Sequence, residues 1–213
     1  YDANVGGISF VAPASCTDST TAADKIACFS NRNALVQIFA PGSRITSTWI
    51  TGGSAIEDGT SMATPHVAGA IALLNQYLNA TGQSRTPAQI KSVLNSTGKV
   101  IHDSASNITF NLNYSRINIY AAIISVDNTG PNVTLVSPAN ATGSINVNQT
   151  FLCNATDLSL KNGTFFLWNS SNSVINQTSQ SFTGSAAVLQ INITNMSIGA
   201  FNWNCLFTDE NNN

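Results

Sequence analysis

The chain has 213 residues, of which 43% are hydrophobic and only 8% are charged, and its formal net charge at pH 7 is −2. This length corresponds to one or two ordinary domains with real hydrophobic cores. There is no basic stripe for nucleic acid, and no apolar run reaches the ~18 residues of a membrane span, so we expect no nucleic-acid partner and no membrane span in this chain.

The ends and the cysteines carry further information. The sequence starts with Tyr1 and stops at DENNN without the pattern of a completed fold, so we expect a fragment of a longer protein. Its four cysteines include no CxxC pair with metal spacing, which favours disulfides or buried thiols over zinc and favours an oxidising compartment.

Residues 1–126 begin with short apolar runs. The runs GGISFVAPAS (6–15) and LVQIFAPG (35–42) contain or end in Pro and Gly, as buried strands of a mostly parallel sheet do. Cys16 and Cys28 lie between these runs and either close a short loop or leave a buried thiol at Cys28. We therefore expect an α/β architecture for this region.

Three helices are predicted after these strands. Apolar residues recur at helical spacing from Ser61 to near Gly82, with small residues between them that permit close packing. Thr86 and the residues after it match a capping box with a first-turn proline, so a second helix is predicted to start there and to end near Gly98. A third helix is predicted to begin near Ser115.

Turn residues at VDNTGP (126–131) separate this region from the rest, so residues 127–131 are interpreted as a linker and 132–213 as an all-β domain that is truncated. Beyond the linker, apolar and polar residues alternate. The alternation places Cys153 and Cys205 on the inward faces of two strands, which predicts a disulfide between two sheets. The order Cys153, Trp168, Cys205 resembles an immunoglobulin-like β-sandwich.

The β region is poor in charge and rich in N-x-S/T sequons. Nine sequons lie in it, against four in the first region. Glycan attachment on the sandwich domain is one interpretation, and chance in an Asn- and Thr-rich sequence is the other.

Residues 58–70, DGTSMATPHVAGA, present a candidate nucleophile. A serine hydroxyl needs a nearby base and hydrogen-bond donors for the oxyanion. Ser61 lies at the start of the predicted helix, so its own N–H is one of the unpaired donors of a first turn. Pro65 has no N–H to return to the Ser61 carbonyl, and Gly59 permits a close backbone approach.

The two histidines do not fit as the base. Five helical residues rotate by about 500°, which turns His66 roughly 140° away from Ser61, so we expect it to pack as a structural residue. His102 would be the late base of an α/β-hydrolase, but that family needs G-x-S-x-G and Ala63 replaces the last glycine.

The segment GTSMATPHVAG (59–69) resembles the serine motif of the subtilisin family of serine proteases, nearest to its proteinase K branch. FSN (29–31), FAPGSRITSTW (39–49), TPAQIKSVL (86–94) and SRINIYAAI (115–123) resemble the same family in order and spacing. The resemblance covers about residues 5–126 and implies the C-terminal portion of a subtilisin-like three-layer α/β domain.

The resemblance implies that Ser61 is the nucleophile and its backbone N–H an oxyanion donor. Gly59, Thr60, Pro65 and His66 would support the nucleophile turn. In this family the catalytic Asp and His precede the serine far upstream, and no such motifs occur here, so the chain alone is predicted to be inactive.

Further site residues follow from their context. Asn4 lies near the distance of the family's oxyanion asparagine, but its context favours a turn. Asp58 is interpreted as a solvated loop carboxylate. Calcium binding is implied by the resemblance as a possibility, without named ligands.

We interpret the chain as part of a secreted serine endopeptidase, extracellular or on the cell surface, that cuts protein or peptide substrates through an acyl-enzyme on Ser61. The alternative is a cell-surface binding or adhesion protein in which a protease-like module is an inactive scaffold.

Overall fold

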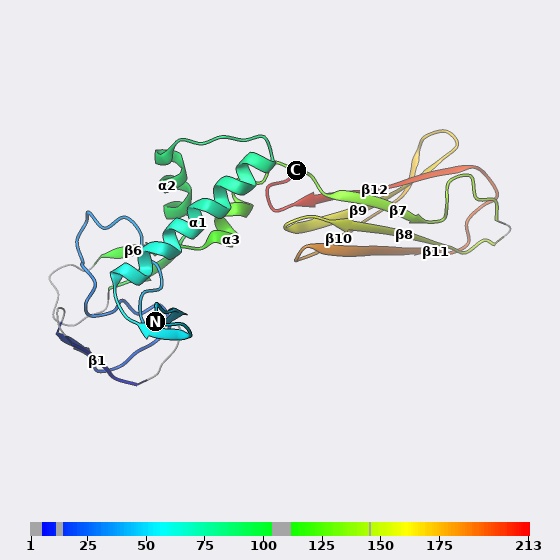
Figure 1. Cartoon of the computed structure of the whole chain (residues 1–213). Helices are drawn as coiled ribbons and strands as arrows, with labels where there is room; N and C mark the ends of the chain where they lie inside the picture. The colour runs from blue at the N-terminus through cyan, green and yellow to red at the C-terminus, as the bar shows by residue number, and fades with distance from the viewer. Residues whose placement is uncertain (1–5, 12–14, 104–111, 145) are drawn as a thin grey trace. The chain divides into compact units, whose positions relative to one another are not determined.

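The computed structural model describes residues 6–11, 15–103, 112–144 and 146–213 and divides into two compact units, Tyr1–Val126 and Asp127–Asn213 (Figure 1). Residues 127–131, which the sequence suggested as a linker, fall in the second unit. Asn4 lies outside the described residues.

The strands of the first unit form antiparallel pairs. They are β1 (Ile8–Phe10) with β2 (Cys16–Asp18), β3 (Ile45–Thr48) with β4 (Ser54–Glu57), and β5 (Lys99–His102) with β6 (Asn113–Arg116). A disulfide joins Cys16 to Cys28, which decides between the two interpretations left open above.

The prediction of a mostly parallel sheet is wrong for the described residues, where parallel pairing is limited to one bridge between Phe39 and Arg116. A parallel neighbour must be brought alongside by a crossover connection. Here most strands pair instead with the next strand along the chain, because a short connection suffices for an antiparallel pair. The first unit remains a mixed α/β structure.

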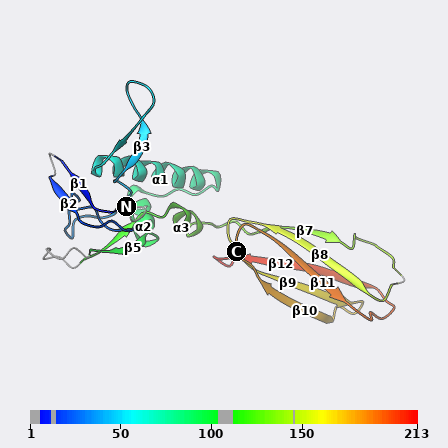
Figure 2. The same cartoon turned by 90° about the horizontal axis from the view of Figure 1, so that it is seen from below.

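Three helices pack together in this unit: α1 (Thr60–Ala80), α2 (Pro87–Ser96) and α3 (Ile119–Ile124) (Figures 1 and 2). Their shared core consists of apolar residues from all three helices and from the end of the unit: Ala70, Leu74, Leu78, Ile90, Leu94, Ala122 and Val126. Only three of the 21 residues of α1 are buried, so most of this helix is not covered by the described residues.

The predicted helix starts agree with the structure except at α3. Thr86 caps α2, with its hydroxyl accepting from Gln89 N and the Gln89 side chain accepting from Thr86 N. The third helix starts at Ile119 rather than near Ser115, because Ser115 pairs with Val100 in the β5–β6 ladder. Asn118 then caps α3 by accepting from Ala121 N.

The second unit consists of two three-stranded antiparallel sheets, ordered β10–β9–β12 and β11–β8–β7 (Figure 2). The strands are β7 (Asn132–Ser137), β8 (Gln149–Thr156), β9 (Leu160–Asn169), β10 (Val174–Ser181), β11 (Ala186–Ile193) and β12 (Phe201–Asp209). Both sheets contribute to one hydrophobic core, so the unit is two-layered.

Alternation correctly predicted the inward faces of β8 and β12. Cys153 of β8 and Cys205 of β12 are buried and form the expected disulfide, which links the two sheets. The core tryptophan is Trp203, whose ring lies 5.4 Å from that of Phe151. Trp168 instead stacks on Phe166, at an interplanar angle of 13°, because both belong to the β9 face opposite the buried Phe165 and Leu167 side chains.

Candidate active site

Ser61 lies in the first turn of α1, with its side chain exposed. Its hydroxyl contacts Met62 Sδ at 3.4 Å, and its backbone N–H has no hydrogen-bond acceptor among the described residues. A free N–H at a helix N-terminus faces outward with partial positive charge. The geometry therefore presents an exposed hydroxyl and an unbonded N–H from the same residue.

A backbone contact between Gly42 and Gly59 supports the turn that carries Ser61. Gly59 N donates to Gly42 O at 2.7 Å, and Met62 N donates to Gly59 O at 3.1 Å. A Cβ added to Gly59 would lie 3.1 Å from Ser61 Oγ, and Gly59 has a positive φ of 157°. A Cβ added to Gly42 would lie only 2.7 Å from Gly59 O. Both positions need glycine so that two backbone segments can meet beside Ser61.

Asp58 organises the neighbouring loop, which corrects its interpretation as a solvated carboxylate. Its Oδ1 accepts from Ser43 Oγ at 2.7 Å and from Arg44 N at 2.6 Å. These bonds join the loop after Gly42 to Asp58, directly before the turn that carries Ser61. Sequence reasoning missed this link, although Gly42–Arg44 belong to the FAPGSRITSTW segment that carried the family resemblance.

Neither histidine contacts Ser61 in the described part of the chain. His66 Nδ1 lies 2.9 Å from Met62 O, one turn back along α1, and His66 is half-buried. His102 Nδ1 lies 2.8 Å from Asn113 Oδ1 on the β5–β6 pair. The expected structural role of His66 is consistent with this geometry.

Thr60 and Pro65 shape the first two turns of α1. Thr60 O accepts from Thr64 Oγ1 at 3.1 Å, so a side chain supplies one of the bonds of this turn. Pro65 lies inside the helix, where it cannot donate to the Ser61 carbonyl. Both residues thus belong to the first two turns of α1, and their expected support of the Ser61 turn stays a prediction.

An open pocket of about 310 Å³ lies beside α1 and is lined by Thr60, Ala63, Thr64 and Val67 of the helix and by Gly42. Ser61 is absent from its lining. The pocket therefore lies beside the first two turns of α1, and the Ser61 side chain does not line it.

A charged network borders the same pocket. Asp24 forms ion pairs with Lys99 and Arg116. The hydrogen bond from Lys99, with the Arg116 charge nearby, holds the pKa of Asp24 below its ordinary value of 3.8, although partial burial opposes the shift. Burial raises the pKa of Tyr114, whose buried hydroxyl has no hydrogen-bond partner in the described structure. The ion pairs join Asp24 to both strands of the β5–β6 pair.

Around Ser61, the described residues bring no three potential metal ligands together. The calcium expected from the family resemblance thus stays a prediction. No helix within the described ranges is long and apolar enough to cross a membrane.

Comparisons with known proteins agree with this geometry. Residues 14–116 match the model of the Subtilase family. The chain is 50% identical over 82 residues to an alkaline serine exoprotease A of Vibrio alginolyticus, a match that covers 38% of this chain and 15% of that protein. It is 47% identical over 79 residues to a cuticle-degrading protease of Metarhizium anisopliae, covering 37% of this chain and 19% of that protein.

A third relative is a subtilisin-like protease 7 of Arthroderma gypseum, 41% identical over 98 residues. This match covers 46% of the chain and 24% of that protein. The chain thus spans only 15–24% of the length of these three relatives. The matched segment includes the Ser61 turn, the Gly42 contact and the helices α1 and α2, so residues 14–116 of this chain are similar to the subtilase family over the candidate site.

Proposed function

We propose that the chain is part of a secreted serine endopeptidase in which Ser61 attacks the peptide carbonyl. The observation that carries the proposal is the pairing of an exposed Ser61 hydroxyl with its own unbonded N–H at the start of α1. Attack by Oγ forms an acyl-enzyme and a transient oxyanion, and a free N–H at a helix start is suited to stabilise that charge.

The general base and its acid are supplied by sequence outside this chain. Both histidines present here are turned to other partners, His66 to Met62 O and His102 to Asn113. A serine without a base loses on the order of 10⁶ in turnover. The 213-residue chain alone is therefore catalytically silent, and the activity belongs to the longer protein.

The names of the relatives support an extracellular setting. One relative is called an extracellular serine proteinase, and another a cuticle-degrading protease. Two disulfides in this chain suit an oxidising compartment. Its substrates are proteins or peptides, bound across the Ser61 face.

The second unit is an immunoglobulin-like sandwich appended to the peptidase. Support comes from its two sheets, their common core and the Cys153–Cys205 bond between them. N-linked glycans attach to its exposed sequon asparagines in a host that performs this modification. Six of the nine are exposed: Asn132, Asn140, Asn148, Asn154, Asn192 and Asn195.

The test compares the full-length protein with two variants. Unsubstituted full-length protein should label with a fluorophosphonate and hydrolyse casein, and Ser61→Ala should lose both reactions. His66→Ala should lower the yield of folded protein more than the activity of each folded molecule, and active-site titration separates these effects. Casein hydrolysis that survives Ser61→Ala would overturn the protease assignment and favour the inactive scaffold.

A further inference from the structure

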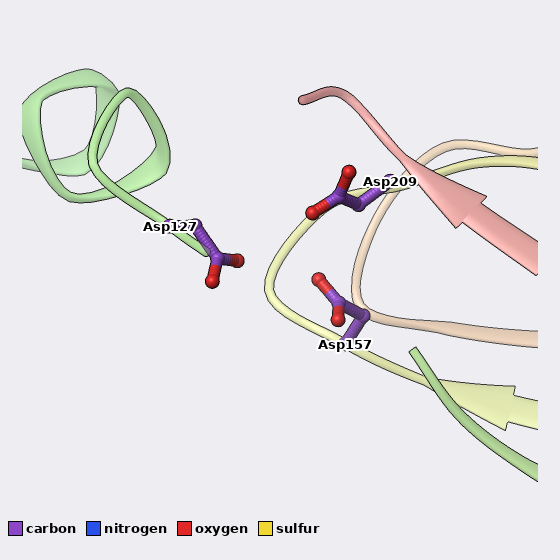
Figure 3. Close-up of side chains that lie close together, drawn as sticks. All are labelled: Asp127, Asp157 and Asp209. Atoms are coloured by element: carbon purple, nitrogen blue, oxygen red, sulfur yellow. The ribbon is translucent and has the colours of Figure 1, made fainter. Parts of the chain in front are cut away.

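Three carboxylates converge at one end of the second unit, outside the residues that match the subtilase family (Figure 3). Asp127 opens the unit, Asp157 follows β8, and Asp209 is the last residue of β12. Each aspartate contributes one carboxylate oxygen, and these three oxygens all lie within 4.8 Å of one another.

Burial makes this grouping unusual. Asp209 is fully buried and Asp127 is 5% exposed, while Asp157 is half-buried. Ionised carboxylates are costly to bury without a compensating positive charge, and like charges this close repel one another.

The unit has almost no positive charge of its own. Lys161 is the only lysine or arginine in residues 127–213, and its Nζ donates to Asn212 Oδ1 at 3.0 Å. Neither Asp157 nor Asp209 forms an ion pair with another described residue. The chemistry of the cluster therefore calls for a cation from solution.

Hydrogen bonds hold the carboxylates in place. Asp209 accepts from Asn213 N at 2.8 Å and from Asn213 Nδ2 at 3.0 Å. Asp157 Oδ1 accepts from Ser159 N at 3.1 Å. The Asp127 carbonyl also accepts from Asn213 Nδ2, at 3.1 Å, which ties the start of the unit to its end. Asp127 Oδ1 accepts from Thr129 N at 2.9 Å and from Thr129 Oγ1 at 2.7 Å, so all three carboxylates are held in place before any ligand arrives.

A separate observation concerns the Ser159 hydroxyl. Ser159 is only 6% exposed, and its Oγ is buried without a hydrogen-bond partner in the described structure. Ser159 connects the segments that carry Asp157 and Asp209, because its N–H donates to Asp157 and its carbonyl accepts from the N–H of Glu210, next to Asp209. Buried hydroxyls are normally satisfied, so an oxygen left without a partner here indicates a ligand that completes its bonding.

We propose that Asp127, Asp157, Asp209 and the Ser159 hydroxyl bind a calcium ion. All four ligands are oxygens, which calcium prefers, and the absence of His and Cys from the group disfavours zinc. Calcium accepts six to eight oxygen ligands in a flexible arrangement, with water completing the shell, whereas magnesium demands near-octahedral geometry.

The test is a calcium titration of the full 213-residue chain, stripped with chelator, by isothermal calorimetry and thermal unfolding. We expect one site with a Kd of about 10⁻³ M or tighter, the range of extracellular calcium modules, and a higher unfolding temperature in calcium. No binding heat and no shift of the unfolding temperature up to about 10 mM calcium would overturn the proposal. An equal response to magnesium would overturn the choice of calcium.

Variants separate a bound ion from a structural role. Asp157→Asn keeps an oxygen for the Ser159 N–H but removes one charge, so calcium affinity should fall by about tenfold or more. Without calcium, this variant should be at least as stable as the unsubstituted chain, because repulsion between carboxylates is relieved. A purely structural carboxylate would instead lose stability without calcium, and that result would count against the site.

Glu210→Gln is the matched control, since Glu210 is exposed, next to Asp209, and outside the cluster. It makes the same change of charge and should keep the full calcium response. Ser159→Ala should weaken binding without changing the net charge. Equal losses in Asp157→Asn and Glu210→Gln would show unspecific charge screening and refute the proposed site.

Discussion

Alanine at Gly42 and alanine at Gly69 should change the stability of the first unit in opposite directions. At Gly42, an added Cβ would lie 2.7 Å from Gly59 O and 3.3 Å from Ala63 Cβ. The first contact is with backbone and cannot be relieved by turning a side chain. Gly59 itself would have to move, together with its 2.7 Å hydrogen bond to Gly42 O.

Gly69 supplies the control. It lies within α1, and an added Cβ would meet nothing within 4 Å. The close contact at Gly42 is overpacking, which costs about 1–3 kcal/mol, so Gly42→Ala should destabilise the unit by that amount. Gly69→Ala should stabilise it by roughly 0.5–1 kcal/mol, because alanine is the better helix former.

Hydrogen exchange of α1 peptides, read by mass spectrometry, measures both effects within the first unit alone. Exchange through opening should become about 5- to 150-fold faster in Gly42→Ala, since each 1.4 kcal/mol is tenfold, and slower in Gly69→Ala. Equal protection of α1 in Gly42→Ala and the unsubstituted chain would refute the argument that the two backbones need glycine to meet.

Three further predictions concern stability. Arg32→Ala should cost about 3–5 kcal/mol, because it leaves the buried Asp103 carboxylate without the guanidinium 3.0 Å away, and urea unfolding should show the loss. The pKa of Asp24 is lowered on folding, so its stabilisation is complete above the unfolded value of 3.8 and disappears as pH falls through the lower folded value. Asp24→Asn should therefore make unfolding less dependent on pH below 4, and an unchanged acid dependence would contradict this. Replacing Cys153 and Cys205 by alanine should lower the free energy of unfolding of the second unit by about 4 kcal/mol, because the disulfide closes a loop of 52 residues. A small change in the unfolding midpoint of this unit would contradict the prediction.

Features that depend on near neighbours in sequence were predictable. The α2 cap needs only Thr86 and Gln89, three residues apart, and both bonds form. The inward faces of β8 and β12 follow from alternation with a period of two, which correctly placed Cys153 and Cys205 in one core. The Ser61 helix was likewise predictable, because the spacing of its apolar residues is a local pattern.

Features that depend on distant neighbours were missed or wrong. A parallel sheet was inferred from apolar runs, yet composition does not say which strands come to lie side by side. Asp58 was read as solvated because its partners Ser43 and Arg44 precede it by about fifteen residues. The order Cys153, Trp168, Cys205 suggested the immunoglobulin-like resemblance, yet Trp168 lies on the β9 face opposite the buried side chains, and it is Trp203 that packs against Phe151.

The hydrogen bond between Asn213 Nδ2 and the Asp127 carbonyl holds the two ends of the segment 127–213 side by side. A module with adjoining ends can be grafted into a host loop without stretching that loop, and it can be circularly permuted through a short bridge between Asn213 and Asp127. New termini could then open in the exposed segment 139–144, which contains none of the three aspartates. Because its two ends lie side by side, the segment 127–213 is suited to loop insertion and circular permutation in engineered proteins.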